Sequence, residues 1–251
     1  MPTTPTAPPP GSLLTHSTTA APTQSGRPSP FLRFAARTGL SLVVAYVVID
    51  VVLQLLPPHY SPISDAESNL AVGPFGWAMN LNFLARAGMT FCVLLVVARI
   101  GTSTVTGRLG SLLLAGAGLC SAALVFFPTD VNAPGEFGIA PTTTVGAVHV
   151  AFATIGFLLA LAAMTLLSLW MRRVPEMVGV LRSAAVMLGV AVVGLVSLAV
   201  SIAWIPSVLG LTERICLAGI LGWAFVVCMG ARPLDRRRSS RRRESHARAA
   251  S

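Results

Sequence analysis

Asp130 and His149 are the two side chains of this sequence that are best suited to chemistry. Asp130 follows Phe127-Pro128-Thr129 at the end of one apolar stretch, and His149 lies one to two turns inside the next. A carboxylate and an imidazole that meet beneath a short loop can orient a base, relay protons, or bind a metal together with Asp65 or Glu67. The pair can equally be a structural clamp on the loop. Because no H-E-x-x-H, H-x-x-x-H or nucleophile-elbow pattern accompanies it, no catalytic residue, metal ligand or cofactor is assigned.

A second polar group lies in the segment 57–75 and at the start of the apolar stretch that follows it. Asn80 shares a helical face with Trp77, three residues earlier. An amide in hydrocarbon needs a partner, which we expect on another helix. Together with Asp130 and His149, the polar residues of this segment define a candidate external polar pocket. Its members are Asp65, Glu67, Asn69, Trp77, Asn80, Asp130 and His149.

Asp50 and Arg86 are the two charges that we place within apolar stretches. A charge at the centre of a membrane helix costs about 2.5–3.5 kcal/mol, so each needs a partner or a route to water. Asp50 lies about 9 Å and Arg86 about 15 Å from the same ends of their helices, depths at which they could pair. We interpret them as a structural ion pair or a snorkelling aspartate. The functional alternative is an ion pair that lines a polar pathway.

Six long apolar stretches must position these residues. The 251-residue chain is 54% hydrophobic and 11% charged, unlike a soluble domain. Each stretch is close to or above the roughly 20 residues that cross a hydrocarbon core about 30 Å thick. We therefore predict an all-α fold, a six-helix transmembrane bundle, with spans at about 34–56, 76–98, 108–127, 144–170, 180–204 and 209–230.

The arginines predict the orientation of this bundle. They cluster before the first stretch, between the second and third, between the fourth and fifth, and after the sixth, whereas segments 57–75 and 128–143 contain no Arg or Lys. Cytoplasmic loops carry the positive excess. We therefore expect a multi-pass protein of the plasma membrane with both termini in the cytoplasm.

The two ends of the chain differ in composition from the transmembrane domain, which we place at 31–230. Residues 1–30 are rich in Pro, Thr and Ser, and we predict a disordered cytoplasmic tail. Residues 231–251 form an Arg-rich cytoplasmic tail, expected to be a flexible extension. The net charge of +9 is interpreted as attraction to anionic lipid headgroups rather than to nucleic acid. The oligomeric state is left open.

Small residues indicate where helices approach closely. Gly118 in the third stretch and the stripe of Gly194, Ser197 and Ser201 in the fifth are interpreted as contacts within the bundle, with dimer contacts as the alternative. The four cysteines lie inside predicted spans without a C-x-x-C spacing, and we interpret them as apolar packing. Trp170 is expected in an aromatic belt at the inner boundary.

The sequence from Ser68 to Trp77, SNLAVGPFGW, followed by Asn80, resembles the signature at the second helix of the domain-of-unknown-function 998 membrane proteins. Phe127-Pro128-Thr129-Asp130 and His149 also match that pattern. The resemblance covers about residues 40–230. It implies a multi-helix bacterial or archaeal membrane protein whose activity is not established, and it assigns no role to Asp50 or Arg86.

Three functions remain open from the sequence. The first is a small transporter-like or scaffolding protein with an external polar pocket. The second is a membrane-embedded enzyme or metal-binding protein that uses Asp130 and His149. The third is a regulatory protein whose Arg-rich tail contacts lipid or an intracellular partner. We favour the first, and we do not interpret the chain as an enzyme.

Overall fold

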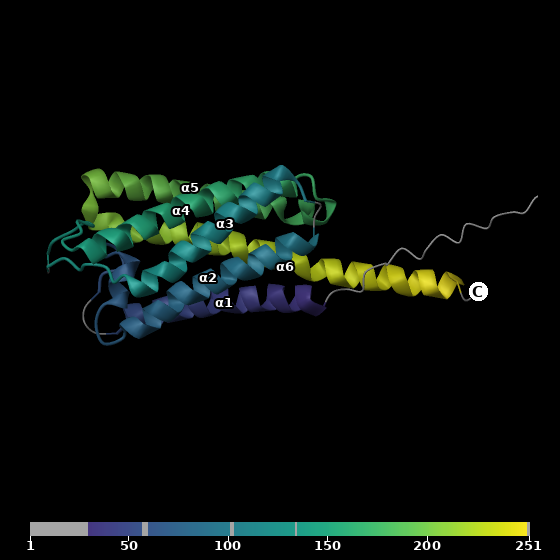
Figure 1. Ribbon diagram of the computed structural model, residues 1–251, viewed down its shortest axis with the longest axis horizontal. Coiled ribbons are helices and arrows are strands. Elements are labelled where there is room, and N and C mark those ends of the chain that lie inside the picture. Colours follow the sequence, from purple (N-terminus) through teal and green to yellow (C-terminus); the bar gives the residue numbers. More distant parts are fainter. Residues whose placement is uncertain (1–29, 57–59, 101–102, 134, 250–251) are drawn as a thin grey trace, which may run out of the picture.

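The computed structural model describes residues 30–56, 60–100, 103–133 and 135–249, with side chains as far as Ala231. This part of the chain is helical and contains no strand. Six long helices are joined by loops and short 3₁₀ turns (Figure 1). The helices are α1 (Pro30–Gln54), α2 (Gly76–Ile100), α3 (Val105–Ala123), α4 (Thr144–Met171), α5 (Val178–Trp204) and α6 (Leu209–Ala249), and the 3₁₀ turns are η1 (Glu67–Ala71), η2 (Leu124–Phe126), η3 (Pro175–Met177) and η4 (Pro206–Val208).

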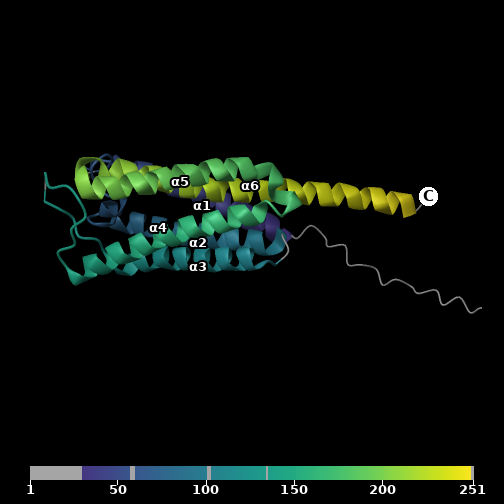
Figure 2. The same ribbon diagram turned by 90° about the horizontal axis from the view of Figure 1, so that it is seen from above.

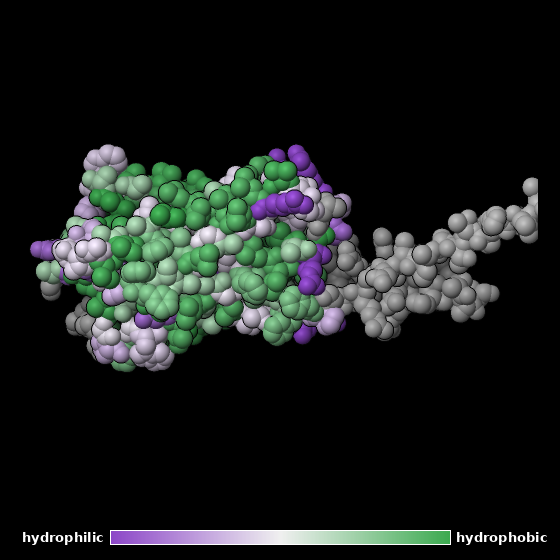
Figure 3. Space-filling model, in the orientation of Figure 1, coloured by the Kyte–Doolittle hydropathy of each residue, from purple (hydrophilic) through white to green (hydrophobic). Residues whose placement is uncertain are grey.

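Each long helix contains a segment of sufficient length and hydropathy to cross a membrane. The helical spans agree with the six predicted stretches, and the largest shifts are at their starts: the first begins at Pro30 and the fifth at Pro175. Large apolar side chains cover the outside of the bundle, among them Val48, Phe91, Leu112 and Val193 (Figure 3). Such a surface is stable only in an apolar solvent. The predicted fold class is therefore confirmed.

The connections divide the bundle into two ends. The α1–α2 loop, the α3–α4 loop and the α5–α6 turn gather at one end, which we call the loop end (Figures 1 and 2). The start of α1 and the continuation of α6 lie at the opposite end, called the terminal end. Exposed arginines gather at the terminal end, namely Arg33, Arg37, Arg99, Arg108, Arg172, Arg173 and Arg182.

Small residues let neighbouring helices touch at their backbones. A Cβ on Gly194 of α5 would overlap the backbone of Cys216 in α6, and a Cβ on Gly219 of α6 would overlap Ala191 in α5. Ser201 of α5 and Thr212 of α6 lie within hydrogen-bond distance, at 3.0 Å between their hydroxyl oxygens. Gly118 of α3 packs against the side chain of Thr90 in α2 in the same way. These residues make contacts within the bundle, as the sequence predicted.

The terminal half of the bundle has an apolar core. Val93 and Val96 of α2 pack there with Met164, Leu167 and Met171 of α4. Trp170 belongs to this core and is only 3% exposed, so its expected place in an inner aromatic belt is wrong. The reason is Gly107, whose missing side chain leaves room for the indole ring.

The C-terminal segment continues α6 as a helix to Ala249 and projects beyond the bundle (Figure 1). We expected a flexible extension there. Arg and Ala, which make up twelve of the 21 residues 231–251, have high helix propensity. The predicted disorder of residues 1–30 concerns a segment that, apart from Pro30, lies outside the described residues.

Candidate functional site

The α1–α2 loop folds back onto the first turn of α6. The Leu211 amide donates to the Ile63 carbonyl oxygen at 2.9 Å. A side chain at Gly210 would overlap the carbonyl oxygen of Asp65, so glycine permits this approach. Two segments about 150 residues apart in sequence are thereby held against each other at the loop end.

Arg214 of α6 binds this loop through its carbonyl groups. Its Nη1 lies 3.2 Å from the oxygen of Pro62 and 3.4 Å from that of Asp65. Its Nη2 donates to the Tyr60 hydroxyl at 2.5 Å and lies 3.8 Å from Oδ1 of Asp50. The side chains of Arg214 and Asp50 are 18% and 15% exposed, so this ion pair is largely shielded from water.

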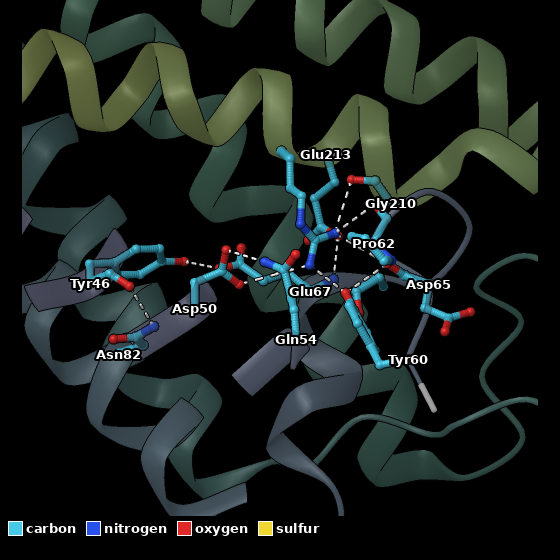
Figure 4. A network of polar contacts seen from close by, with 12 residues as sticks. Tyr46, Asp50, Gln54, Tyr60, Pro62, Asp65, Glu67, Asn82, Gly210 and Glu213 are labelled. Atoms are coloured by element: carbon cyan, nitrogen blue, oxygen red, sulfur yellow. Dashed lines mark hydrogen bonds and ion pairs between the residues drawn. The ribbon is translucent and has the colours of Figure 1, made fainter. Parts of the chain in front are cut away.

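Three carboxyl groups surround this guanidinium group, and each comes from a different segment (Figure 4). Asp50 is on α1, Glu67 on η1 and Glu213 on α6. An oxygen of Glu213 accepts the Glu67 amide proton at 2.8 Å, and Gln54 donates to Asp50 at 2.6 Å. Glu67 itself is 3% exposed. We call Asp50, Glu67 and Glu213 the acidic cluster.

Burial and charge determine the protonation of the loop residues in this network. Burial, reinforced by the nearby carboxylates of Asp50 and Glu213, raises the pKa of Glu67 to about 8. Burial also raises the pKa of Tyr60 above its ordinary value, so the residue stays a neutral phenol that can donate and accept. Glu67 therefore changes charge near neutral pH.

The polar network continues from the acidic cluster toward the middle of the bundle. Tyr46 of α1 donates its hydroxyl proton to Glu67 at 2.7 Å, and the side chain of Asn82 donates to the Tyr46 carbonyl oxygen at 3.1 Å. Arg86 lies one turn further along α2 and donates from Nε to the Ser121 hydroxyl at 2.8 Å. A cavity of about 50 Å³ adjoins Arg86, Thr90 and Ser121, which is room for a few water molecules.

An external pocket of about 600 Å³ opens above this network between the two long loops. Asp65 and Asn69 of the candidate polar pocket line it, together with Tyr60, Asn132 and Glu136. Glu67 lies buried behind Ala66 rather than on the pocket wall.

Trp77 and Asn80 lie outside the lining of the external pocket. Trp77 is 65% exposed at the start of α2, as an interfacial aromatic residue would be. The neighbouring amide that enters the buried network is Asn82, which is fully buried.

Asp130 closes the second long loop onto the start of α4. Its carboxylate accepts the amide protons of Thr142 and Thr143 at 2.7 and 2.8 Å and the Thr143 hydroxyl proton at 2.8 Å. These hydrogen bonds, led by the Thr143 amide, lower the pKa of Asp130. Gly146 lies so close that any side chain there would overlap this carboxylate. The arrangement has the geometry of the structural clamp considered above.

His149 has a different partner from the one considered in the sequence. Its Nδ1 lies 2.6 Å from the Phe127 carbonyl oxygen, which can only accept, so Nδ1 carries the proton. The carboxylate of Asp130 makes its hydrogen bonds to the threonines instead. His149 is 2% exposed, and its Nε2 has no hydrogen-bond partner.

The expected pairing of Asp50 with Arg86 is replaced by the pair of Asp50 with Arg214. Glu213 and Arg214 were missed as site residues, although both lie inside the predicted stretch 209–230. The signal was present in the sequence, since both charges follow Pro206 by less than ten residues within an apolar stretch. Their partners could not be predicted, because the loop that meets them is more than 140 residues away.

Within the part of the chain that the structure describes, no three His, Cys, Asp or Glu side chains converge closely enough to hold a metal ion. Cys92, Cys120, Cys216 and Cys228 are buried free thiols.

The fold and the polar network define a multi-pass helical membrane protein. Residues 40–230, which include α2 to α5, most of α1, the first half of α6 and both long loops, match the family model described as a protein of unknown function, DUF998. The chain belongs to this family, as the resemblance at the second helix indicated. No curated protein and no solved structure matches it significantly.

Proposed function

We propose that this protein is a small transporter whose external pocket leads a proton or a small cation to the acidic cluster. The observation that carries the proposal is the convergence of Asp50, Glu67 and Glu213 around the single guanidinium of Arg214. Because the carboxyl groups outnumber this guanidinium in a shielded site, Glu67 can hold a proton there and release it near neutral pH. Intramembrane carboxyl groups with this arrangement are typical of ion and proton pathways.

The route that we propose begins in the external pocket and ends near the middle of the bundle. Asp65 and Tyr60 line the pocket, and Tyr60 is hydrogen bonded to Arg214. Tyr46 and Asn82 connect the acidic cluster to α2, where Arg86 and the 50 Å³ cavity follow. Beyond that cavity the apolar core of the terminal half closes the path. A site open at one end and closed at the other is what one state of an alternating-access carrier requires.

We further propose that the loop end faces the outside of the plasma membrane and that both termini are cytoplasmic. The exposed arginines at the terminal end support this orientation. In that orientation the Arg-rich continuation of α6 lies on the cytoplasmic side, where each basic residue near anionic lipid contributes about 1 kcal/mol. The tail would then be a lipid-binding element.

A flux measurement tests the proposed transport. Purified protein is reconstituted into vesicles that contain a pH-sensitive dye, and a potassium gradient with valinomycin drives protons inward. We expect faster acidification than in protein-free vesicles, and we expect Glu67→Gln to abolish the difference. Glu176→Gln, which changes an exposed carboxyl group of η3 at the terminal end, is the matched control and should retain the flux.

A second arm of the same measurement replaces the proton gradient with a gradient of methylammonium or sodium. If neither protons nor these cations cross faster than in protein-free vesicles, the transport proposal is wrong. The acidic cluster would then be a structural joint between the α1–α2 loop and α6. The thermal melting of each variant in detergent confirms that a loss of flux is not a loss of fold.

A further inference from the structure

A groove of about 400 Å³ lies between α4 and α5 and borders the external pocket at Ala66. Phe157 and Leu158 of α4 and Leu195, Ala199 and Ile202 of α5 form its apolar walls. From His149 to Leu158 the groove follows nine residues of α4, about 14 Å along the helix, which is about the depth of one membrane leaflet. Its length and apolar lining therefore fit a single hydrocarbon chain.

The loop end of the groove is polar, because His149 and Glu213 both line it. The Nδ1 of His149 donates to Phe127, so Nε2 of the neutral ring is an acceptor, and it is buried without a partner. A buried polar atom without a hydrogen bond keeps the full cost of its lost hydration. A ligand that donates a hydrogen bond here would remove that cost, whereas a ligand that only accepts would not.

The charges of the surrounding side chains further restrict the kind of ligand that this groove can bind. Glu213 belongs to the acidic cluster with Asp50 and Glu67, and Arg214 beside it already donates to carbonyl groups and to Tyr60. The segments 57–75 and 128–143 add Asp65, Asp130 and Glu136 to the same end without any Arg or Lys. The field at the mouth of the groove therefore favours a cation over an anion.

We propose that the groove between α4 and α5 binds one cationic single-chain amphiphile, a long-chain primary amine, with its ammonium group at His149 and Glu213. The ammonium donates one hydrogen bond to Nε2 of His149 and one to the carboxylate of Glu213. The chain lies along the apolar walls in the loop-end leaflet. This site goes beyond the proposed transport function, and the external pocket does not share its polar end.

Photolabelling tests the site. The protein in phosphatidylcholine nanodiscs is exposed to hexadecylamine that carries a diazirine in its chain, and the labelled residues are mapped by peptide mass spectrometry. We expect labels on the α4 and α5 walls of the groove. Unlabelled hexadecylamine should compete with this label, and hexadecanol and palmitate should not.

Two neighbouring substitutions separate the groove from general contact with lipid. Ala199→Trp fills the groove and should reduce the label to background. Val200→Trp, at the same depth but outside the lining, should leave the label unchanged. Glu213→Gln should weaken competition by the amine. If that variant does not fold, the Ala199 and Val200 pair still decides the result.

The proposal is overturned if hexadecanol or palmitate competes as well as the amine, or if labels spread over all lipid-facing helices. Equal labelling of the Ala199→Trp and Val200→Trp proteins overturns it too. Because labelling measures binding without an ion gradient, its outcome does not depend on whether the vesicles show flux. Failure of one proposal is thus distinguishable from failure of the other.

Discussion

Glu67 and Asp130 are both loop carboxyl groups, yet their surroundings change their acidity in opposite directions. Glu67 is buried beside two other acidic side chains, which disfavours its charged form. Asp130 accepts three hydrogen bonds from Thr142 and Thr143, which favours its charged form. Consequently Asp130 contributes stability above its ordinary pKa, and that contribution is lost as the pH falls through its lowered pKa.

For Glu67 the dependence of stability on pH has the opposite sign. Its pKa is raised from 4.5 to about 8, so the folded protein holds a proton that the unfolded chain releases over this range. We expect the stability of the wild type to be highest near the lower value and to fall by a few kcal/mol as the pH rises to about 8.

In Glu67→Gln this decline should be much smaller, because the amide does not ionise. Melting temperatures in detergent from pH 5 to 9 measure the difference, and Glu136→Gln is the control for removing one carboxyl group. Parallel pH profiles for the wild type and Glu67→Gln would contradict the prediction.

At the scale of elements, the closest helix pair is held by backbone contact rather than by large side chains. Gly194 on α5 meets the backbone of Cys216 on α6, and Gly219 on α6 meets Ala191 on α5. In a membrane, lipid tails compete with apolar side chains, so close packing of backbones is an important source of helix association. α5 and α6 should therefore behave as one hairpin unit.

Gly194→Ala is expected to destabilise this hairpin by about 1–3 kcal/mol or more, because the new methyl group must push the two backbones apart. Gly189→Ala is the matched control in the same helix, since nothing lies within 4 Å of its Cβ position. Removing that glycine should be neutral or stabilise the helix by up to about 1 kcal/mol. Unfolding in a titration with sodium dodecyl sulfate measures both. Equal effects of the two substitutions would show that the backbones do not touch.

At the scale of the whole molecule, an even number of helices brings the start of α1 and the projecting part of α6 to the same end of the bundle (Figure 1). The exposed arginines lie at that end. Because such groups resist transfer across the membrane, we expect this end to stay in the cytoplasm.

Reporter fusions test this orientation. A periplasm-active reporter should be active after Ser68 and Glu136 and inactive after Ser103 and Glu176, and a cytoplasm-active reporter should give the opposite pattern. Activity of the periplasmic reporter at Ser103 or Glu176 would show that the bundle has the opposite orientation. The external pocket would then open to the cytoplasm.

The sequence alone determined the number of spans, their approximate ends and the contacts of Gly118 and Gly194. Each of these features depends on local composition or on a short helical repeat. It also grouped Asp65, Glu67 and Asn69 as polar residues, because they are near neighbours in a segment that contains no basic residue.

Only the tertiary structure decided which charges meet. Asp50 pairs with Arg214 rather than Arg86 because the α1–α2 loop folds onto α6, and Gly210 permits that approach. His149 turns its Nδ1 to the Phe127 carbonyl because Asp130 is already bonded to Thr142 and Thr143. A buried polar group takes the partner that the packing of distant segments brings within reach, and no local pattern in the chain encodes that choice.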